Sequence, residues 1–275
     1  MQAEEPFEAL PRTDGNVAAV GASRVPLLVA VYSIGLVLFL AVEPTKPWIL
    51  LVVTALVALG TDGILREHPQ AARQQDAAWT APLLFLPTLL ALGGGLFLED
   101  AVHGYWIVPS AAIVALLMAA VLYGEDLSID ETGVMYPLAR FILNLGTYLT
   151  AFAFYAVVYT FDVSLLPAAF AVGLVSLLLA VEILREAEAD PLRALVFAGA
   201  VGLMIAEVRW ALYFLPLESY LAGVLLLLCF YLASGLVQHH LNRDLHGAVV
   251  GEFGTIALLG VLIVALGRIC ESGGC

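Results

Sequence analysis

Nine long apolar segments constrain the fold of this chain more than any other feature. Each is close to the roughly 20 residues that a helix needs to cross a bilayer. They cover residues 25–42, 48–65, 79–98, 105–123, 136–161, 165–184, 192–215, about 220–239, and 249–267. The apolar runs are continuous, whereas a transmembrane β-barrel would show short alternating segments. We therefore predict an all-α, polytopic transmembrane helix bundle of about nine spans.

The composition supports a bundle that is covered by lipid. Hydrophobic residues make up 62% of the chain and charged residues only 13%, against about 45–50% and about 25% in soluble domains. A chain of this length cannot bury so much apolar surface in its own core, so we expect the lipid bilayer to be its main partner. The short loops suit the cell inner (plasma) membrane. The net charge of −13 comes without a basic patch, which argues against nucleic-acid binding.

The distribution of lysine and arginine predicts how the bundle is oriented. If the N-terminus lies inside, the inner segments hold 8 of the 11 Lys and Arg residues and the outer segments hold 2, with Arg209 inside a span. Positive residues gather on the cytoplasmic side, so we expect the N-terminus inside and the C-terminus outside. Residues 1–24 are polar and acidic and lack a secretory signal pattern. We expect a disordered cytoplasmic tail over 1–24, a transmembrane bundle over 25–268 and a short outer tail over 269–275.

The seventh apolar segment carries two charges, Glu207 and Arg209. Ionisable residues inside a span are costly and commonly mark function. Residues two apart point to different faces of a helix, so the two side chains need not pair with each other. Because a carboxylate is too short to reach the interface easily, we expect Glu207 to face the bundle interior. The alternatives are a packing contact between helices and the wall of a polar cavity in the outward half.

The fifth segment carries a polar stripe, since Arg140, Asn144 and Tyr148 recur every four residues and share one helix face. Tyr155 and Tyr159 continue this polar character toward the other end. The stripe is either an interfacial arginine with packed polar neighbours or a polar seam through the bundle. Together with Glu207 and Arg209, it forms our candidate intramembrane polar site, with the fifth helix as the expected partner of the seventh.

Two smaller features lie at predicted span ends. Glu182 and Arg185 are three residues apart at the end of the sixth segment, so we expect them to pair on the helix. Cys270 and Cys275 lie in the predicted outer tail, where they form either a disulfide or free thiols. The five histidines lack the spacing of a helical metal site, so we predict no metal and no cofactor.

Phosphate-binding loops, nucleophile elbows and dinucleotide fingerprints are all missing from the sequence. Nine spans with an inside N-terminus are similar in layout to the intramembrane prenyltransferases, whose inner Asp-rich motifs hold Mg²⁺ for a diphosphate. This chain departs from that pattern, because the second segment has only Asp62 near its end and no Asp-rich motif there, and the acidic clusters follow the fourth and sixth segments. The likeness is one of layout alone.

Three function classes therefore stay open. The first is a transporter or permease-like protein with a polar site in the outward half. The second is a non-catalytic membrane subunit or scaffold. The third is a Mg²⁺-dependent intramembrane transferase that uses the inner-loop carboxylates. We favour a protein without catalytic activity, whose small-molecule substrate or partner subunit the sequence does not identify.

Overall fold

The computed structural model describes residues 14–42, 46–66, 81–130, 132–161, 163–187, 190–215, 219–244 and 246–271. Over these ranges the chain forms nine long helices and no strand. Their bounds are α1 Asp14–Ala41, α2 Pro47–Arg66, α3 Ala81–Ala101, α4 Ile107–Ser128, α5 Tyr136–Thr160, α6 Leu165–Leu184, α7 Pro191–Leu212, α8 Ser219–Leu241 and α9 Gly247–Glu271. A short 3₁₀ turn, Gly104–Trp106, precedes α4. All nine are long and apolar enough to span a membrane, which confirms the predicted multi-pass helical bundle.

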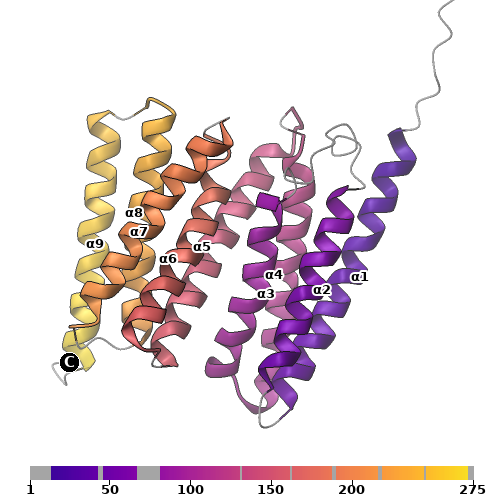
Figure 1. The fold of residues 1–275 in the computed structure, drawn as a ribbon, viewed down its shortest axis with the longest axis horizontal. Coiled ribbons are helices and arrows are strands. Elements are labelled where there is room, and N and C mark those ends of the chain that lie inside the picture. Colours follow the sequence, from indigo (N-terminus) through magenta and orange to yellow (C-terminus); the bar gives the residue numbers. More distant parts are fainter. Residues whose placement is uncertain are drawn as a thin grey trace, which may run out of the picture.

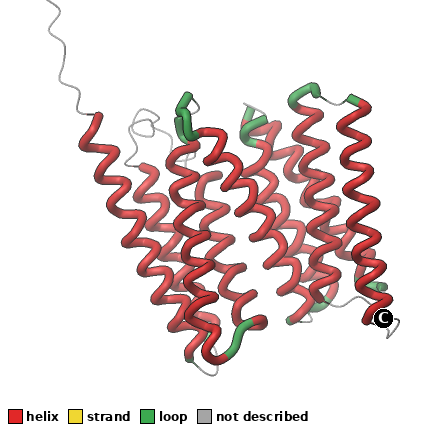
Figure 2. Tube along the Cα trace, turned by 180° about the vertical axis from the view of Figure 1, so that it is seen from behind, coloured by secondary structure: helices red, strands yellow, loops and turns green. Residues whose placement is uncertain are grey.

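The helices lie side by side in approximately sequence order, from α1 at one flank to α9 at the other (Figures 1 and 2). Helix α5 occupies the middle and packs against α3, α4, α6 and α8. Helix α7 packs mainly against α6, and α9 packs against α8. The start of α1 and the end of α9 lie at opposite ends of the bundle (Figure 1). We call the end that holds the start of α1 the N face.

Glycines allow the close approach of helices near the centre. Helix α3 is continuous even though it contains Pro87 and the run Gly93–Gly95. A Cβ atom at Gly93 would lie 2.6 Å from the ring of Phe154 on α5, and one at Gly95 would collide with Leu50 on α2. The glycine run is therefore a close-packing surface, as small residues commonly are between membrane helices.

Some sequence expectations fall outside the described residues or differ in their bounds. Helix α1 begins at Asp14, earlier than the first span expected from residue 25. Residues 1–13 and 272–275 are not among the described ranges, nor is the side chain of Cys270. The disordered tail and the disulfide between Cys270 and Cys275 therefore remain predictions, as does the placement of the N-terminus inside.

A buried ionic network and cavity as the candidate site

Arg140, near the start of α5, is paired with one carboxylate in the last turn of α6 and with a second just beyond its end. Its Nη1 donates to Glu182 Oε1 at 3.2 Å, and its Nε donates to Glu186 Oε2 at 2.9 Å. Its Nη2 donates to the backbone carbonyl of Glu182 at 3.3 Å. Arg140 is 5% exposed and Glu182 is fully buried. One guanidinium therefore fastens the start of α5 to the last turn of α6 in a site largely removed from water.

Arg185, at the end of α6, extends these contacts to α4. Its Nη2 lies 2.7 Å from Glu182 Oε1, which confirms the predicted pair within the helix. The same Nη2 donates to Glu125 Oε2 at 2.9 Å and to Ser128 Oγ at 3.3 Å. Arg140 and Arg185 thus connect three helices through shared carboxylates. We call Glu125, Arg140, Glu182, Arg185 and Glu186 the N-face network, because all lie where α4 ends, α5 begins and α6 ends.

The opposite charges of the N-face network stabilise one another in a site of low dielectric constant. Burial disfavours the charged form of Arg185, but the attraction of Glu182 and Glu125 outweighs this cost and raises its pKa above the ordinary value. Removing one partner from a buried ion pair leaves an uncompensated charge, at a cost of about 3–5 kcal/mol. The network therefore holds α4, α5 and α6 in one arrangement only while both guanidiniums are present.

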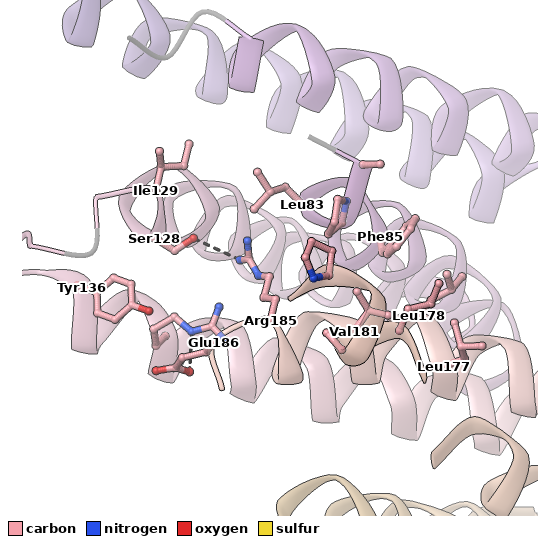
Figure 3. Close-up of a pocket in the computed structure, with 16 residues that line it drawn as sticks. Leu83, Phe85, Ser128, Ile129, Tyr136, Leu177, Leu178, Val181, Arg185 and Glu186 are labelled. Atoms are coloured by element: carbon pink, nitrogen blue, oxygen red, sulfur yellow. Dashed lines mark hydrogen bonds and ion pairs between the residues drawn. The ribbon is translucent and has the colours of Figure 1, made fainter. Parts of the chain in front are cut away.

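A cavity of about 620 Å³ lies beside the network and includes Ser128, Tyr136, Arg140, Arg185 and Glu186 in its lining. Figure 3 shows Ser128, Tyr136, Arg185 and Glu186 toward one end, and the apolar side chains Phe85, Leu177 and Leu178 toward the other. Small-molecule sites commonly enclose about 300–1,000 Å³ with apolar walls and a few convergent polar groups. The lining also includes the exposed residues Pro191 and Leu195, so the cavity reaches the surface of the bundle.

The polar stripe of α5 does not form one continuous site. Arg140 belongs to the N-face network, whereas Tyr148 contacts the rings of Phe230 and Tyr231 on α8 at centroid distances of 6.0 and 5.5 Å. Asn144 is half-buried, and its side-chain oxygen has no hydrogen-bond partner among the described residues. Arg140 and Tyr148 therefore contact different parts of the bundle, the end of α6 and the middle of α8.

Arg209 lies near the opposite end of the bundle from Arg140. It is 3% exposed, and its guanidinium carbon lies 4.1 Å from the ring centroid of Tyr159 on α5. The expected contact between α7 and α5 is therefore present, as a cation–π contact. Tyr159 is 19 residues after Arg140, which is about 28 Å along a helix that rises about 1.5 Å per residue. Arg209 and Arg140 thus belong to different sites.

From the sequence we expected Glu207 to face the bundle interior. In the structure it does not face the interior. It is exposed on α7, beside the exposed residues Leu203 and Met204, while Arg209 turns inward. The cause is the helical offset of two residues, which directs one charge into the bundle and the other away from it. Within the described ranges, Glu207 has no ion pair.

Sequence reasoning missed two of the five members of the N-face network, Glu125 and Glu186, and the contacts that join its three helices. Arg140 and the Glu182–Arg185 pair were identified, but Glu125 was read as part of an inner acidic loop. The available signal was position, since Glu125 and Glu182 each lie within the last turn of a helix, before the loop begins. An acidic residue in the last turn follows an apolar helix and precedes a polar loop. Its side chain can therefore point into the bundle and contact an arginine.

The residues that the structure describes contain no group of three or more His, Cys, Asp or Glu side chains that could hold a metal ion. In the N-face network each carboxylate already contacts a guanidinium. This arrangement differs from the open set of oxygen ligands that Mg²⁺ needs when it carries a phosphate substrate. Its chemistry is that of a structural ion-pair cluster with a polar edge on a cavity.

Comparison with known proteins identifies the family of this chain but assigns it no function. Neither the curated proteins nor the solved structures give a match to this chain. Residues 25–267, which include all of the N-face network and most of every helix, match a family described as "Protein of unknown function (DUF5656)". The chain is a multi-pass membrane protein that belongs to this DUF5656 family.

Proposed function

We propose that this membrane protein binds an amphiphilic molecule in the cavity beside the N-face network. The observation that carries the proposal is the division of the cavity lining: Ser128, Arg185 and Glu186 lie at one end, and leucine and phenylalanine side chains at the other (Figure 3). An amphiphile matches both ends, with its polar head at the network and its apolar tail along α3 and α6. The cavity also reaches the bundle surface, which gives a lipid-like molecule a way in from the bilayer.

The charges of the network favour a particular kind of head group. Its described side chains carry three carboxyls and two guanidiniums, so no positive charge is left over for an anionic head. Glu186 and Arg185 remain partly exposed, at 32% and 23% of their side chains. A hydroxylated or zwitterionic head, which both donates and accepts hydrogen bonds, fits this edge better than a phosphate monoester.

Filling the cavity from its lipid-facing side tests the proposal. Leu195→Trp places a large ring in the lining at a residue that is already 49% exposed, so the fold should tolerate it. Leu203→Trp is the matched control, since Leu203 lies on the same helix, is 63% exposed and is outside the lining. The measurement is mass spectrometry of amphiphiles that remain bound after purification in detergent.

We expect one class of amphiphile to be enriched over the bulk lipid in the unmodified protein and in Leu203→Trp, and to be lost from Leu195→Trp. If the three proteins retain the same lipids in bulk proportions, the binding proposal is wrong. Transport of the bound molecule would be a further step, and it would use this end of the bundle rather than the outward-half site that the sequence predicted around Glu207 and Arg209.

The exposed carboxyl of Glu207 favours a second candidate function, that of a membrane subunit that binds another protein. A carboxyl that faces hydrocarbon is costly, and a basic or hydrogen-bonding residue of a partner helix would relieve this cost. A photo-crosslinking amino acid at Ala200, on the same exposed face, would trap such a partner in native membranes. The outcome against it is a variant that stays a single chain, crosslinked to lipid alone, after illumination.

A further inference from the structure

The N-face network contains one more carboxyl than guanidinium, in a site where an unbalanced charge is expensive. Glu125, Glu182 and Glu186 face Arg140 and Arg185. Glu125 and Glu182 are completely buried. A buried ionised group without compensation becomes neutral rather than staying charged. One proton would bring the described side chains of the network to zero net charge.

The contacts identify which carboxyl takes the proton. Glu182 Oε1 lies between both guanidiniums, at 3.2 Å from Arg140 and 2.7 Å from Arg185. Glu186 pairs with Arg140 at 2.9 Å and is partly exposed. Glu182 therefore has two close guanidiniums, and Glu186 has one close guanidinium and access to water.

Glu125 is in the poorest position to carry a charge. Among the described residues, its Oε2 contacts Arg185 alone, and Arg185 also contacts Glu182. Its Oε1 is buried without a hydrogen-bond partner among the described residues. Glu182 Oε2 shares that condition, but Glu182 contacts two guanidiniums and Glu125 contacts one. The charged groups that act on Glu125 are Glu182 and Arg185 from α6 and Arg140 from α5, and Ser128 is the polar neighbour on α4. The nearby negative charge of Glu182 opposes a second one on Glu125.

We propose that the N-face network is a proton-binding site and that Glu125 Oε1 holds the proton at neutral pH. The step is the transfer of one proton from hydronium to the Glu125 carboxylate: one O–H bond of hydronium breaks, one O–H bond forms on Glu125, and water is released. This site does not depend on what occupies the cavity. Because Glu125 contacts Arg185, and Arg185 lines the cavity, loss of the proton would place one more negative charge behind the cavity wall.

Infrared spectroscopy of the purified full-length protein tests the proposal directly. We expect a protonated-carboxyl stretching band at neutral pH that shifts when glutamate is labelled with carbon-13. The band should disappear in Glu125→Gln and persist in Glu252→Gln, a control at an exposed residue of α9 outside the network. The absence of any glutamate band of this kind at neutral pH, or its persistence unchanged in Glu125→Gln, would overturn the proposal.

A second measurement covers the case in which Glu125→Gln does not fold. A carboxyl that is protonated in the folded protein and ionised in the unfolded chain makes stability fall as the pH rises. The melting temperature of the unmodified protein should therefore fall as the pH rises above the ordinary pKa of glutamate, about 4.3, while the labelled band is still present, and it should level off at the alkaline pH at which the band is lost. A melting temperature that does not fall while the band is present, or that keeps the same slope after the band is lost, would contradict the assignment to this site.

Discussion

Arg140 and Arg209 are both buried arginines in transmembrane helices, yet their guanidinium groups have different kinds of partners. Arg140 makes hydrogen bonds from three of its nitrogens to Glu182 and Glu186. Arg209 lies against the ring of Tyr159, and its Nε and Nη1 atoms have no hydrogen-bond partner in the part of the chain that the structure describes.

The difference follows from where each arginine meets its neighbours. Arg140 faces the last turn of α6, where carboxylates can lie at the end of an apolar helix. Arg209 faces the polar stripe of α5 at Tyr159, which offers an aromatic face instead of a carboxylate. Charge compensation makes the N face a rigid junction of three helices, whereas the region of Arg209 is a single weaker contact. The following variants test this contrast in order of the expected loss of stability.

Arg140→Leu should cause the largest loss, about 3–5 kcal/mol, because it leaves the buried Glu182 without one of its two counter-charges. Thermal unfolding in detergent measures the change. Arg66→Gln is the control, since the exposed pair of Arg66 and Asp62 lies at i,i+4 on α2 and such pairs contribute about 0.3–0.5 kcal/mol. Equal losses in the two variants would show that the N-face network does not hold the helices together.

Gly202→Ala should destabilise the seam between α6 and α7 by about 1–3 kcal/mol, because an added Cβ would overpack it. That Cβ would lie 2.6 Å from the carbonyl oxygen of Gly173 and 2.8 Å from the Cβ of Leu177. Gly199→Ala, on the same helix, meets no atom within 4 Å and should be neutral or stabilising by up to about 1 kcal/mol. Indistinguishable melting temperatures would contradict the close contact of these helices.

Arg209→Met should cost less than about 2 kcal/mol, because the cation–π contact that it removes is of that size at most and two unpaired buried N–H groups disappear with it. A double-mutant cycle with Tyr159→Leu should give a coupling of about 0.5–2 kcal/mol. A loss as large as that of Arg140→Leu would mean that Arg209 has a strong charged partner and that the contrast between the two arginines is wrong.

Glu207→Gln should have the smallest effect on the isolated chain, within about 0.5 kcal/mol, as expected for an exposed position. The measurement is the same unfolding assay, made once in detergent and once in native membranes. A loss of stability that appears only in native membranes would support a partner that covers Glu207. A large loss in detergent would mean that the side chain packs within the bundle after all.

The sequence was sufficient for the architecture because a membrane span is a local property of about 20 residues. The glycines of α3 are a different case, since they lie against Phe154 on α5 and Leu50 on α2, contacts that depend on which helices are neighbours. Pairing within one helix was equally local, and the contact of Glu182 with Arg185 was predicted from spacing alone.

The candidate site was only partly predictable because it depends on which helices are neighbours. Nothing in the sequence places Glu125 beside Arg185, which is 60 residues away in the chain. The same limit explains Glu207: its charge was visible, but the face that it occupies follows from how α7 packs on α6. Arg140 was identified for its place in a polar stripe, although its partners are carboxylates of a different helix.

The most direct test of the account is a comparison of what the two ends of α7 touch in the membrane. A photo-crosslinking amino acid placed at Leu195 would report the cavity, and one placed at the exposed Tyr213 would report the opposite end. Mass spectrometry of the adducts should show one saturable class of amphiphile at Leu195 and the bulk lipid mixture at Tyr213. The same bulk mixture at both positions would contradict a binding site beside the N-face network.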